Sequence, residues 1–203
     1  MTGIDLGDEV IEKASSLIGE RKNLTFETGN VLDGLKYEDD SFDVVYTHQT
    51  LIHIPDPVKA IKEIRRVLKP GGVFASRECA NVQLTPSTPE LELFRKAMHE
   101  MMTNGGASGF HGGRMQEFVH EGGFNQEKTL IQGGATVFAT KEEREWWADV
   151  NMGRYREDVG RKCLELGIVD KDGIERIVKG MEKWGKEEVG SWTAWQTEIL
   201  AWK

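Results

Sequence analysis

The sequence predicts an α/β fold: a mostly parallel sheet that carries helices on both faces. In the first half of the 203-residue chain, short strand-like runs alternate with amphipathic helical segments. Strands separated by helices of this length form βαβ units, in which successive strands run parallel. Signals that start and stop helices fall between these runs, so they set the order of the elements. The second half has a different pattern, which predicts a helical insertion.

The first elements are a strand, a helix and two further strands. Residues 3–5 end a strand, and Asp8 is expected to cap a helix that stops near Gly19, because apolar side chains recur there at helical spacing. Residues 24–28 predict a short strand. Residues 42–47 predict a stronger one, since an apolar, β-branched run suits a strand that is covered on both faces.

A capped helix is predicted next. The Asp-Pro pair at residues 56–57 gives a capping side chain followed by proline at the first helical position. Apolar residues, of which Leu68 is the last, form a buried stripe along this helix, and the Lys-Pro-Gly-Gly run at residues 69–72 ends it. Residues 73–76 predict the following strand, and the Thr-Pro pair at residues 88–89 repeats the signal for a helix start.

The second half predicts helices and a closing strand around a glycine-rich loop. Residues 104–113 are rich in glycine and small polar residues and predict a mobile loop. A short helix and a strand at residues 128–132 are expected to follow. Residues 141–184 predict helical structure, with an acidic capping box at residues 172–175. Residues 193–202 predict the closing strand.

Composition argues against several classes of protein. Hydrophobic residues make up 38% of the chain and charged residues 30%, which is typical of a globular domain. No run approaches the roughly 18 apolar residues of a membrane span. The net charge of −8 argues against a nucleic-acid backbone as the main partner. The N-terminus has no signal-peptide pattern, and two cysteines make no disulfide framework, so a cytoplasmic location is expected. The five histidines lack metal-ligand spacing.

Three segments, in the right order, resemble a class I S-adenosylmethionine-dependent methyltransferase. They are residues 2–5 with the helix that follows, residues 29–31, and residues 42–72. The last is the most specific and is similar to the ubiquinone- and menaquinone-biosynthesis branch of that family. The resemblance is strong over about residues 1–78 and general afterwards. It implies a Rossmann-like methyltransferase sheet, S-adenosylmethionine as cofactor, and methyl transfer to an O, N or C nucleophile of a small molecule.

The expected cofactor residues follow the first two strands, because ligands of parallel sheets bind beyond the carboxyl ends of the strands. Asp5, with Leu6 after it, offers a carboxylate that can accept hydrogen bonds from both ribose hydroxyls, the role that the resemblance implies. The alternative is a helix cap or a solvated acid in a turn. Asn30, followed by Val31, stands where the family usually has an acid for the adenine amino group. Its carbonyl can accept that bond, and the alternative is a plain turn asparagine.

The third strand is followed by Thr47, His48 and Gln49, near the place where the methionine moiety and the acceptor meet in the family. His48 is a candidate for orienting or deprotonating an acceptor hydroxyl, because a near-neutral pKa suits a general base. The alternative for His48 is packing against the cofactor or a hydrogen bond to the backbone. His53 matches a histidine that is common in the family's loop before the capped helix, and its role is either catalytic or structural.

Several other residues have two open roles each. Arg77 and Glu78 either touch the substrate or pair with each other. His111 joins the site if the glycine-rich loop closes as a lid, and otherwise is a solvated loop residue. Trp146 and Trp147 either pack between helices or line the acceptor pocket, which is expected beside the tryptophan-bearing helices.

The family's first strand and its glycine-rich loop do not precede residues 2–5, so the resemblance implies an N-terminally truncated sheet. One domain is expected over residues 1–203, with a cofactor-binding half at 1–80 and a substrate-side half with the helical insertion at 81–203. Without the central strand, two facing edges would lack ladder partners. We therefore expect impaired cofactor binding, a homodimer or partner that covers the exposed edge, or a non-catalytic pseudo-methyltransferase that acts as a protein-binding module.

Overall fold

The computed structural model describes residues 1–19, 21–104, 107 and 109–203. The strands are β1 (Thr2–Asp5), β2 (Thr25–Thr28), β3 (Phe42–His48), β4 (Leu68–Thr85), β5 (Thr129–Phe138) and β6 (Ser191–Trp202). The helices are α1 (Asp8–Ser16), α2 (Pro57–Val67), α3 (Pro89–Asn104), α4 (Met115–Glu121), α5 (Lys141–Arg156), α6 (Asp158–Glu165) and α7 (Lys171–Lys186). Short 3-10 turns are η1 (Val31–Asp33), η2 (Leu51–His53), η3 (Gly112–Arg114) and η4 (Gln126–Lys128).

The strands form two sheets. β1 and β2 make a parallel pair, and the second sheet has the order β3–β4–β6–β5. In that second sheet β3 and β4 are parallel, whereas β6 is antiparallel to both of its neighbours. The sheet is therefore mixed rather than mostly parallel, because the closing strand enters between β4 and β5 in the opposite direction.

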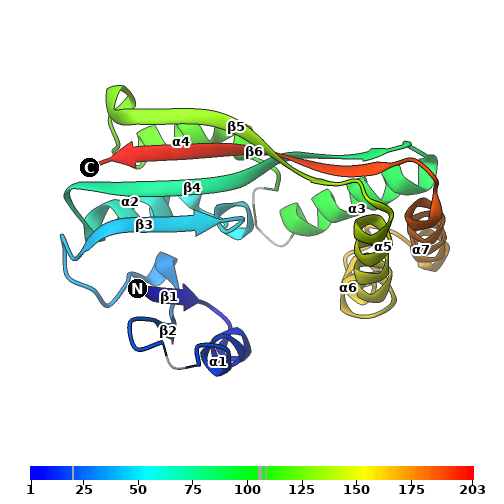
Figure 1. The fold of residues 1–203 in the computed structure, drawn as a ribbon, viewed down its shortest axis with the longest axis horizontal. Coiled ribbons are helices and arrows are strands. Elements are labelled where there is room, and N and C mark those ends of the chain that lie inside the picture. Colours follow the sequence, from blue (N-terminus) through cyan, green and yellow to red (C-terminus); the bar gives the residue numbers. More distant parts are fainter. Residues whose placement is uncertain (20, 105–106, 108) are drawn as a thin grey trace.

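Helices lie on both sides of the second sheet, but not evenly. In Figure 1, α2 and α4 lie behind the sheet, α3 and α5–α7 gather at its right-hand end, and β1, β2 and α1 lie below β3. The sheet face turned toward the viewer carries no helix over its left half. On this face Tyr46 is 61% exposed and Leu130 is 62% exposed, although parallel strands usually have both faces covered.

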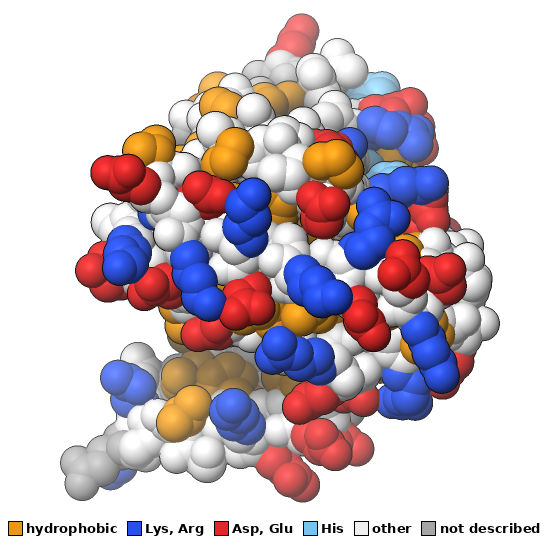
Figure 2. Space-filling view, turned by 90° about the vertical axis from the view of Figure 1, so that its right-hand side faces the viewer, with side chains coloured by type: hydrophobic (Ala, Val, Ile, Leu, Met, Phe, Trp, Pro, Cys, Tyr) orange, Lys and Arg blue, Asp and Glu red, His pale blue; other side chains and the backbone are white. Residues whose placement is uncertain are grey.

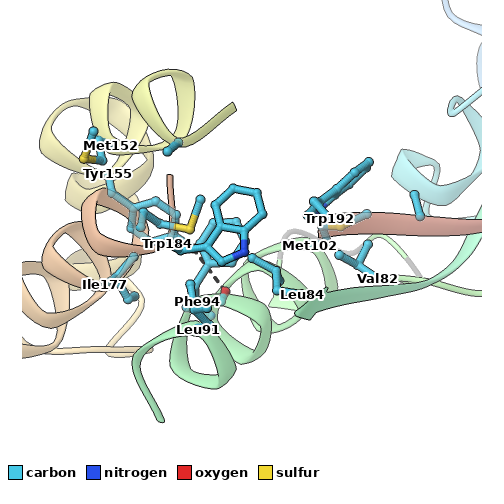
Figure 3. Close-up of a cluster of buried hydrophobic side chains, with 14 of the residues drawn as sticks. Val82, Leu84, Leu91, Phe94, Met102, Met152, Tyr155, Ile177, Trp184 and Trp192 are labelled. Atoms are coloured by element: carbon cyan, nitrogen blue, oxygen red, sulfur yellow. Dashed lines mark hydrogen bonds between the residues drawn. The ribbon is translucent and has the colours of Figure 1, made fainter. Parts of the chain in front are cut away.

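The protein has two clusters of buried apolar side chains. One lies between the second sheet and helices α2 and α4, where the rings of Phe74 and Phe124 are 5.8 Å apart. The other, which we call the helical core, joins α3, α5, α6 and α7 to the ends of β4 and β6. Figure 3 shows its centre, where Trp184 packs among residues of α3 and α7. The indole N–H of Trp184 donates a hydrogen bond to the carbonyl oxygen of Thr85 at 3.0 Å.

Helix caps partly follow the expectation. Asp56 caps α2 as predicted, with its carboxylate accepting the N–H of Lys59 at 2.9 Å. In α1 the cap position is Gly7, and the carboxylate of Asp8 accepts the Thr28 hydroxyl instead. The predicted capping box at residues 172–175 is wrong, because Asp170 caps α7. A capping box occurs instead at the start of α5, at residues 140–143.

The fourth strand is longer than predicted. The sequence assigns Leu68 to the end of a helix, but Leu68 begins β4 and is fully buried. β4 continues past a bulge between Cys79 and Asn81 to Thr85, so it reaches from the α2 side of the sheet to the helical core.

Of the predicted mobile loop at 104–113, residues 105, 106 and 108 lie outside the described residues. Both cysteines are free and buried. In the described part of the chain, no helix combines the length and the apolar character of a membrane span.

Candidate functional site

The carboxyl ends of β1 and β2 bring two predicted site residues together. Asp5 is in register with Thr28, and the N–H of Gly29 donates to the carbonyl oxygen of Asp5 at 2.9 Å. Asn30 follows directly, so it comes next to Asp5 across the two strand ends. The Asp5 side chain is exposed, and one carboxylate oxygen accepts the N–H of Gly7 at 2.9 Å. This bond orients the carboxylate while leaving it open to a ligand.

Asn30 is fixed by hydrogen bonds, and the apolar residues that follow Asp5 and Asn30 differ in their burial. Asn30 caps η1: its side-chain oxygen accepts the N–H of Leu32 at 3.0 Å, and its amide donates to Asp33 at 2.8 Å. A carbonyl oxygen has two lone pairs, so this cap still leaves one for a ligand. Val31 is half-buried and packs against the cluster beneath α2. Leu6, in contrast, is 70% exposed beside Asp5.

The second group of predicted residues lies at the end of β3. The Thr47 hydroxyl donates to Ser76 on β4 at 2.8 Å. Gln49 has a left-handed backbone with φ of 53°, and its side-chain oxygen accepts the N–H of Cys79 at 3.2 Å. His48, between them, is exposed, and its ring stacks on Tyr46 with a centroid distance of 6.3 Å. Of these three side chains, only that of His48 points freely into solvent.

His53 closes the segment, at the end of η2. Its side chain is exposed on one side, yet the protein that surrounds the other side desolvates the ring and lowers its pKa. The imidazole is therefore neutral at physiological pH, which is the form that can accept a proton.

Arg77 and Glu78 do not pair with each other, which removes one of the two sequence alternatives. Arg77 points to the open face of the sheet and makes an ion pair with Glu198 on β6 at 3.0 Å. Glu78 points to the opposite face and is fully buried. Sequence reasoning missed this difference, although the alternation of Phe74, Ser76 and Glu78 along one strand would have placed Glu78 on the covered face.

The two groups of site residues belong to separate sheets. Asp5 and Asn30 lie at the end of the β1–β2 pair, and Thr47, His48 and Gln49 lie at the end of β3. The arrows of β1 and β3 point the same way in Figure 1, so both carboxyl ends open toward the helices at the right of the view.

Two side chains of α2 anchor the connection between these sheets. The guanidinium of Arg66 donates to the carbonyl oxygens of Leu35 and Tyr37, and to the carboxylates of Glu63 and Asp39. Glu63 in turn accepts the N–H of Leu35 at 2.6 Å. These bonds hold the segment that leads from the β1–β2 pair to β3.

A shallow hollow of about 460 Å³ lies on the open face of the second sheet, and Tyr46 of β3 is among the residues that line it. Tyr46 and Leu130 supply its apolar sides, and the ion pair of Arg77 and Glu198 crosses its floor. His48 is in register with Arg77 and its ring stacks on Tyr46, and both of those residues line the hollow, whereas His48 does not.

The remaining candidates pack into the protein. His111 is only 5% exposed and lies edge-on to Phe118 at 5.1 Å, so the expectation of a solvated loop histidine is wrong. Trp147 packs on Trp192 within the aromatic contacts of the helical core, with ring centroids 4.8 Å apart and ring planes tilted by 51°, as expected for a packing residue. Trp146 covers Phe138 at 5.6 Å and is 54% exposed.

The outer surface of the helical end carries interspersed charges of both signs. Figure 2 shows this surface, where basic and acidic side chains alternate rather than gather by sign. Several pairs lie one helical turn apart, such as Lys186 with Glu182 at 2.7 Å. Over the described ranges, no group of three or more histidine, cysteine or acidic side chains is placed to hold a metal ion.

Comparison with known proteins gives a consistent result. A family model described as a methyltransferase domain matches residues 1–146. The chain is 31% identical to the probable methyltransferase ltbC of Aspergillus luteorubrus, over 99% of this chain and 76% of that protein. It is 34% identical to demethylmenaquinone methyltransferase of Staphylococcus aureus, over 47% of this chain and 36% of that protein.

Solved structures share the fold at low sequence identity. The YcgJ protein of Bacillus subtilis matches with a TM-score of 0.55 and 19% identity, over 100% of this chain and 81% of that chain. The [4+2]-cyclase SpnF matches with a TM-score of 0.55 and 17% identity, over 100% of this chain and 65% of that chain. At these identities the likeness concerns the fold alone, and a fold does not fix a reaction.

Proposed function

The chain belongs to the methyltransferase domain family, and from this premise we propose that it transfers a methyl group from S-adenosylmethionine to an O, N or C nucleophile of a small molecule. Family membership confirms the predicted resemblance, the Rossmann-like α/β fold class, the enzyme class and S-adenosylmethionine as the cofactor of the family. The observation that carries the proposal to particular residues is that Asp5 and Asn30 lie at the adjoining carboxyl ends of two neighbouring strands, where Asp5 is in register with Thr28 and bonded to Gly29.

The chemistry of these two side chains fits a nucleoside. A carboxylate accepts two hydrogen bonds from neighbouring hydroxyls, and Asp5 is exposed and oriented by the N–H of Gly7. We propose that Asp5 holds the ribose and that the side-chain oxygen of Asn30 accepts the adenine amino group. Leu6 and Val31 would then flank the base with apolar surface.

The acceptor side is proposed to lie at the end of β3. Bound S-adenosylmethionine supplies a methyl group already activated by its sulfonium, so the protein contributes mainly alignment. His48 is exposed and stacks on Tyr46, a residue that lines the hollow, and its ring can orient an acceptor hydroxyl or take its proton. Thr47 and Gln49 bond to β4, which supports a role in holding His48 in place.

The proposal is tested by titrating S-adenosylhomocysteine into the protein and following amide shifts by nuclear magnetic resonance, which measures weak binding as well as tight binding. Asp5→Asn is expected to weaken the affinity by about 10- to 100-fold, because a hydrogen bond to a charged group contributes about 1.5–3 kcal/mol. Glu9→Gln, an exposed acid on α1, is the matched control and should leave affinity unchanged. Equal affinities for Asp5→Asn and wild type would remove Asp5 from the site.

We also propose that this chain binds its cofactor weakly. Asp5 sits on a pair of strands with no buried residue among those described, so part of the binding free energy must order that pair. A dissociation constant in the low micromolar range for wild type would overturn this expectation.

A second candidate function is that of a non-catalytic relative that binds protein. It is favoured by the sheet order: β1 pairs with β2 alone, and β3 ends the second sheet, so each has an edge without a ladder partner in the described ranges. Such edges accept a further strand, here proposed to come from a second copy of the chain. Size-exclusion chromatography with light scattering should then report a dimer. A monomer that binds S-adenosylhomocysteine through Asp5 would decide for the enzyme.

A further inference from the structure

A buried acid lies directly behind the segment that carries both candidate histidines. Glu78, on β4, is 0% exposed, and its carboxyl group faces the turn that follows β3. One carboxyl oxygen accepts the N–H of Thr50 at 3.2 Å, and the other accepts the N–H of Ile52 at 3.3 Å. The hydroxyl of Ser76 donates to the first oxygen at 3.3 Å. The carboxyl group thus fills a small nest of backbone donors at the start of η2.

The segment that this group holds is unfavourable by itself. Gln49 has a left-handed backbone with φ of 53°, which residues with a side chain seldom adopt. Two bonds to β4 keep it there: its N–H donates to the carbonyl oxygen of Arg77 at 2.9 Å, and its side-chain oxygen accepts the N–H of Cys79. The bonds to Glu78 begin at the next residue. Residues 49–52 are therefore bound to β4 at four points.

The backbone of β4 is tightly packed at Glu78. Gly112 of η3 packs on the backbone of β4 there, and a Cβ atom at Gly112 would lie 2.6 Å from the carbonyl oxygen of Glu78 and 2.7 Å from the N–H nitrogen of Ala80. Leu51 and Ile52, which cover the carboxyl group, are buried as well. The backbone of Glu78 is therefore held in place by close packing. A residue that fixes the position of a loop needs such a rigid backbone.

We propose that Glu78 is a positioning residue, whose carboxyl group holds residues 48–53 in the conformation that presents His48 to the acceptor. This inference rests on the proposed function for the role of the loop, although the hold on the loop itself can be measured without it. Glu78 touches no cofactor or acceptor atom in this account, so it acts only through the segment.

The choice of a carboxyl group at this place has a physical reason. Burial raises the pKa of Glu78, whereas the hydrogen bonds from the surrounding backbone N–H groups lower it. The burial of this acid costs free energy, and these hydrogen bonds offset part of that cost. In the structure the two backbone N–H groups bond to different oxygens of the carboxyl group. Glutamine offers one acceptor oxygen, and its NH₂ group would face an N–H group. Glu78→Gln therefore has nearly the same volume but loses at least one of the two bonds.

The test compares Glu78→Gln with Glu198→Gln by amide hydrogen exchange. Glu198 lies on the neighbouring strand at the level of Arg77 and bonds toward the open face, so it is a matched acid outside the nest. In Glu78→Gln the amides of Thr50 and Ile52 are expected to exchange at least about 10-fold faster than in wild type, while those of α7 keep their rate. Unchanged rates at Thr50 and Ile52, or an equal rise across the whole protein, would overturn the proposal.

A second readout separates this inference from the proposed function. If wild type binds S-adenosylhomocysteine and methylates an acceptor, Glu78→Gln should lower kcat more than it changes KM, because His48 loses its position while Asp5 remains. A loss confined to KM would overturn the positioning role. If wild type binds no S-adenosylhomocysteine, the proposed function fails, and the exchange rates at Thr50 and Ile52 still decide whether Glu78 holds the loop. Should Glu78→Gln fold poorly, Glu78→Asp serves in the same comparison, since its shorter side chain cannot reach both donors.

Discussion

The two ends of the molecule are built in opposite ways. The N-terminal unit, which comprises β1, α1 and β2, has no buried residue among those described, and α1 exposes Val10. The helical core, by contrast, excludes water from large side chains, so that Ile177 and Met181 are 0% exposed and Trp184 is 1% exposed. Apolar burial is the main source of stability, so the N-terminal unit has little of its own.

The difference matters because the less stable end carries the proposed cofactor residues. Ligand-binding segments are commonly drawn from the least stable parts of a protein. A ligand that binds the ordered form of such a segment stabilises it by mass action. The comparison therefore predicts a protein whose two ends respond differently to mutation and to cofactor.

The largest contrast is expected in native-state hydrogen exchange. Amides of β2, such as that of Phe26, should open with a free energy near zero, whereas those of α7 should approach the global value, a difference of about 5 kcal/mol or more. S-adenosylhomocysteine should slow exchange in β2 and leave α7 unchanged. Comparable protection in β2 and α7 without ligand would contradict the description of the N-terminal unit as weakly held.

A substitution in the helical core should have the next largest effect. Trp184→Ala is expected to lower the free energy of unfolding by about 3–5 kcal/mol, because it leaves a large cavity and removes the donor to Thr85. Trp146→Ala is the matched control, since Trp146 is 54% exposed, and should cost about 1 kcal/mol. Urea denaturation gives both values. Equal losses for the two variants would mean that burial does not separate these tryptophans.

Sequence reasoning predicted the first half of the fold well, for a local reason. The cap at Asp56 and the apolar run of β3 act within a few residues, so they can be read from the sequence. The direction of β6 and the length of β4 could not be read, because they depend on pairing between residues more than a hundred positions apart. Register is a long-range property that local patterns leave open.

The candidate site shows the same division. The positions of Asp5 and Asn30 follow from the rule that ligands lie beyond the carboxyl ends of strands, and the structure brings the two residues together. The roles of Arg77 and Glu78 depend on which face of β4 is covered, and by what. A run of glycines predicted exposure for His111, but the ring is buried against Phe118 of α4, a packing contact that the composition of the loop does not encode.

A smaller effect is expected where the segment that follows the N-terminal unit is bound to α2. Arg66→Lys keeps the charge but cannot make the forked bonds to Leu35, Tyr37 and Glu63. It should lower the local opening free energy of the segment at residues 35–39 by about 1 kcal/mol, a modest value because Arg66 is partly exposed.

Amide exchange at Leu35 measures the effect of Arg66→Lys. Arg161→Lys, which removes pairs confined to α6, is its control and should leave Leu35 unchanged. If both variants change the exchange of Leu35 equally, Arg66 is not the connection between the N-terminal unit and α2.

The smallest effect that we predict is a pH dependence of the unfolding free energy. It comes from Glu78, an acid buried in the well-packed part of the protein, and not from the exposed acids elsewhere. Because desolvation raises the pKa of Glu78 above its ordinary value of 4.5, the folded chain binds a proton there more tightly than the unfolded chain does. The contribution of Glu78 to stability is therefore present below pH 4.5 and falls as the pH rises through the raised pKa. Cys79 beside it has a pKa raised to about 11 and stays neutral throughout this range. Subtracting the unfolding free energy of Glu78→Gln from that of wild type should give a difference that declines between acid and neutral pH. A difference that grows with pH would mean that the backbone donors around Glu78 outweigh its burial.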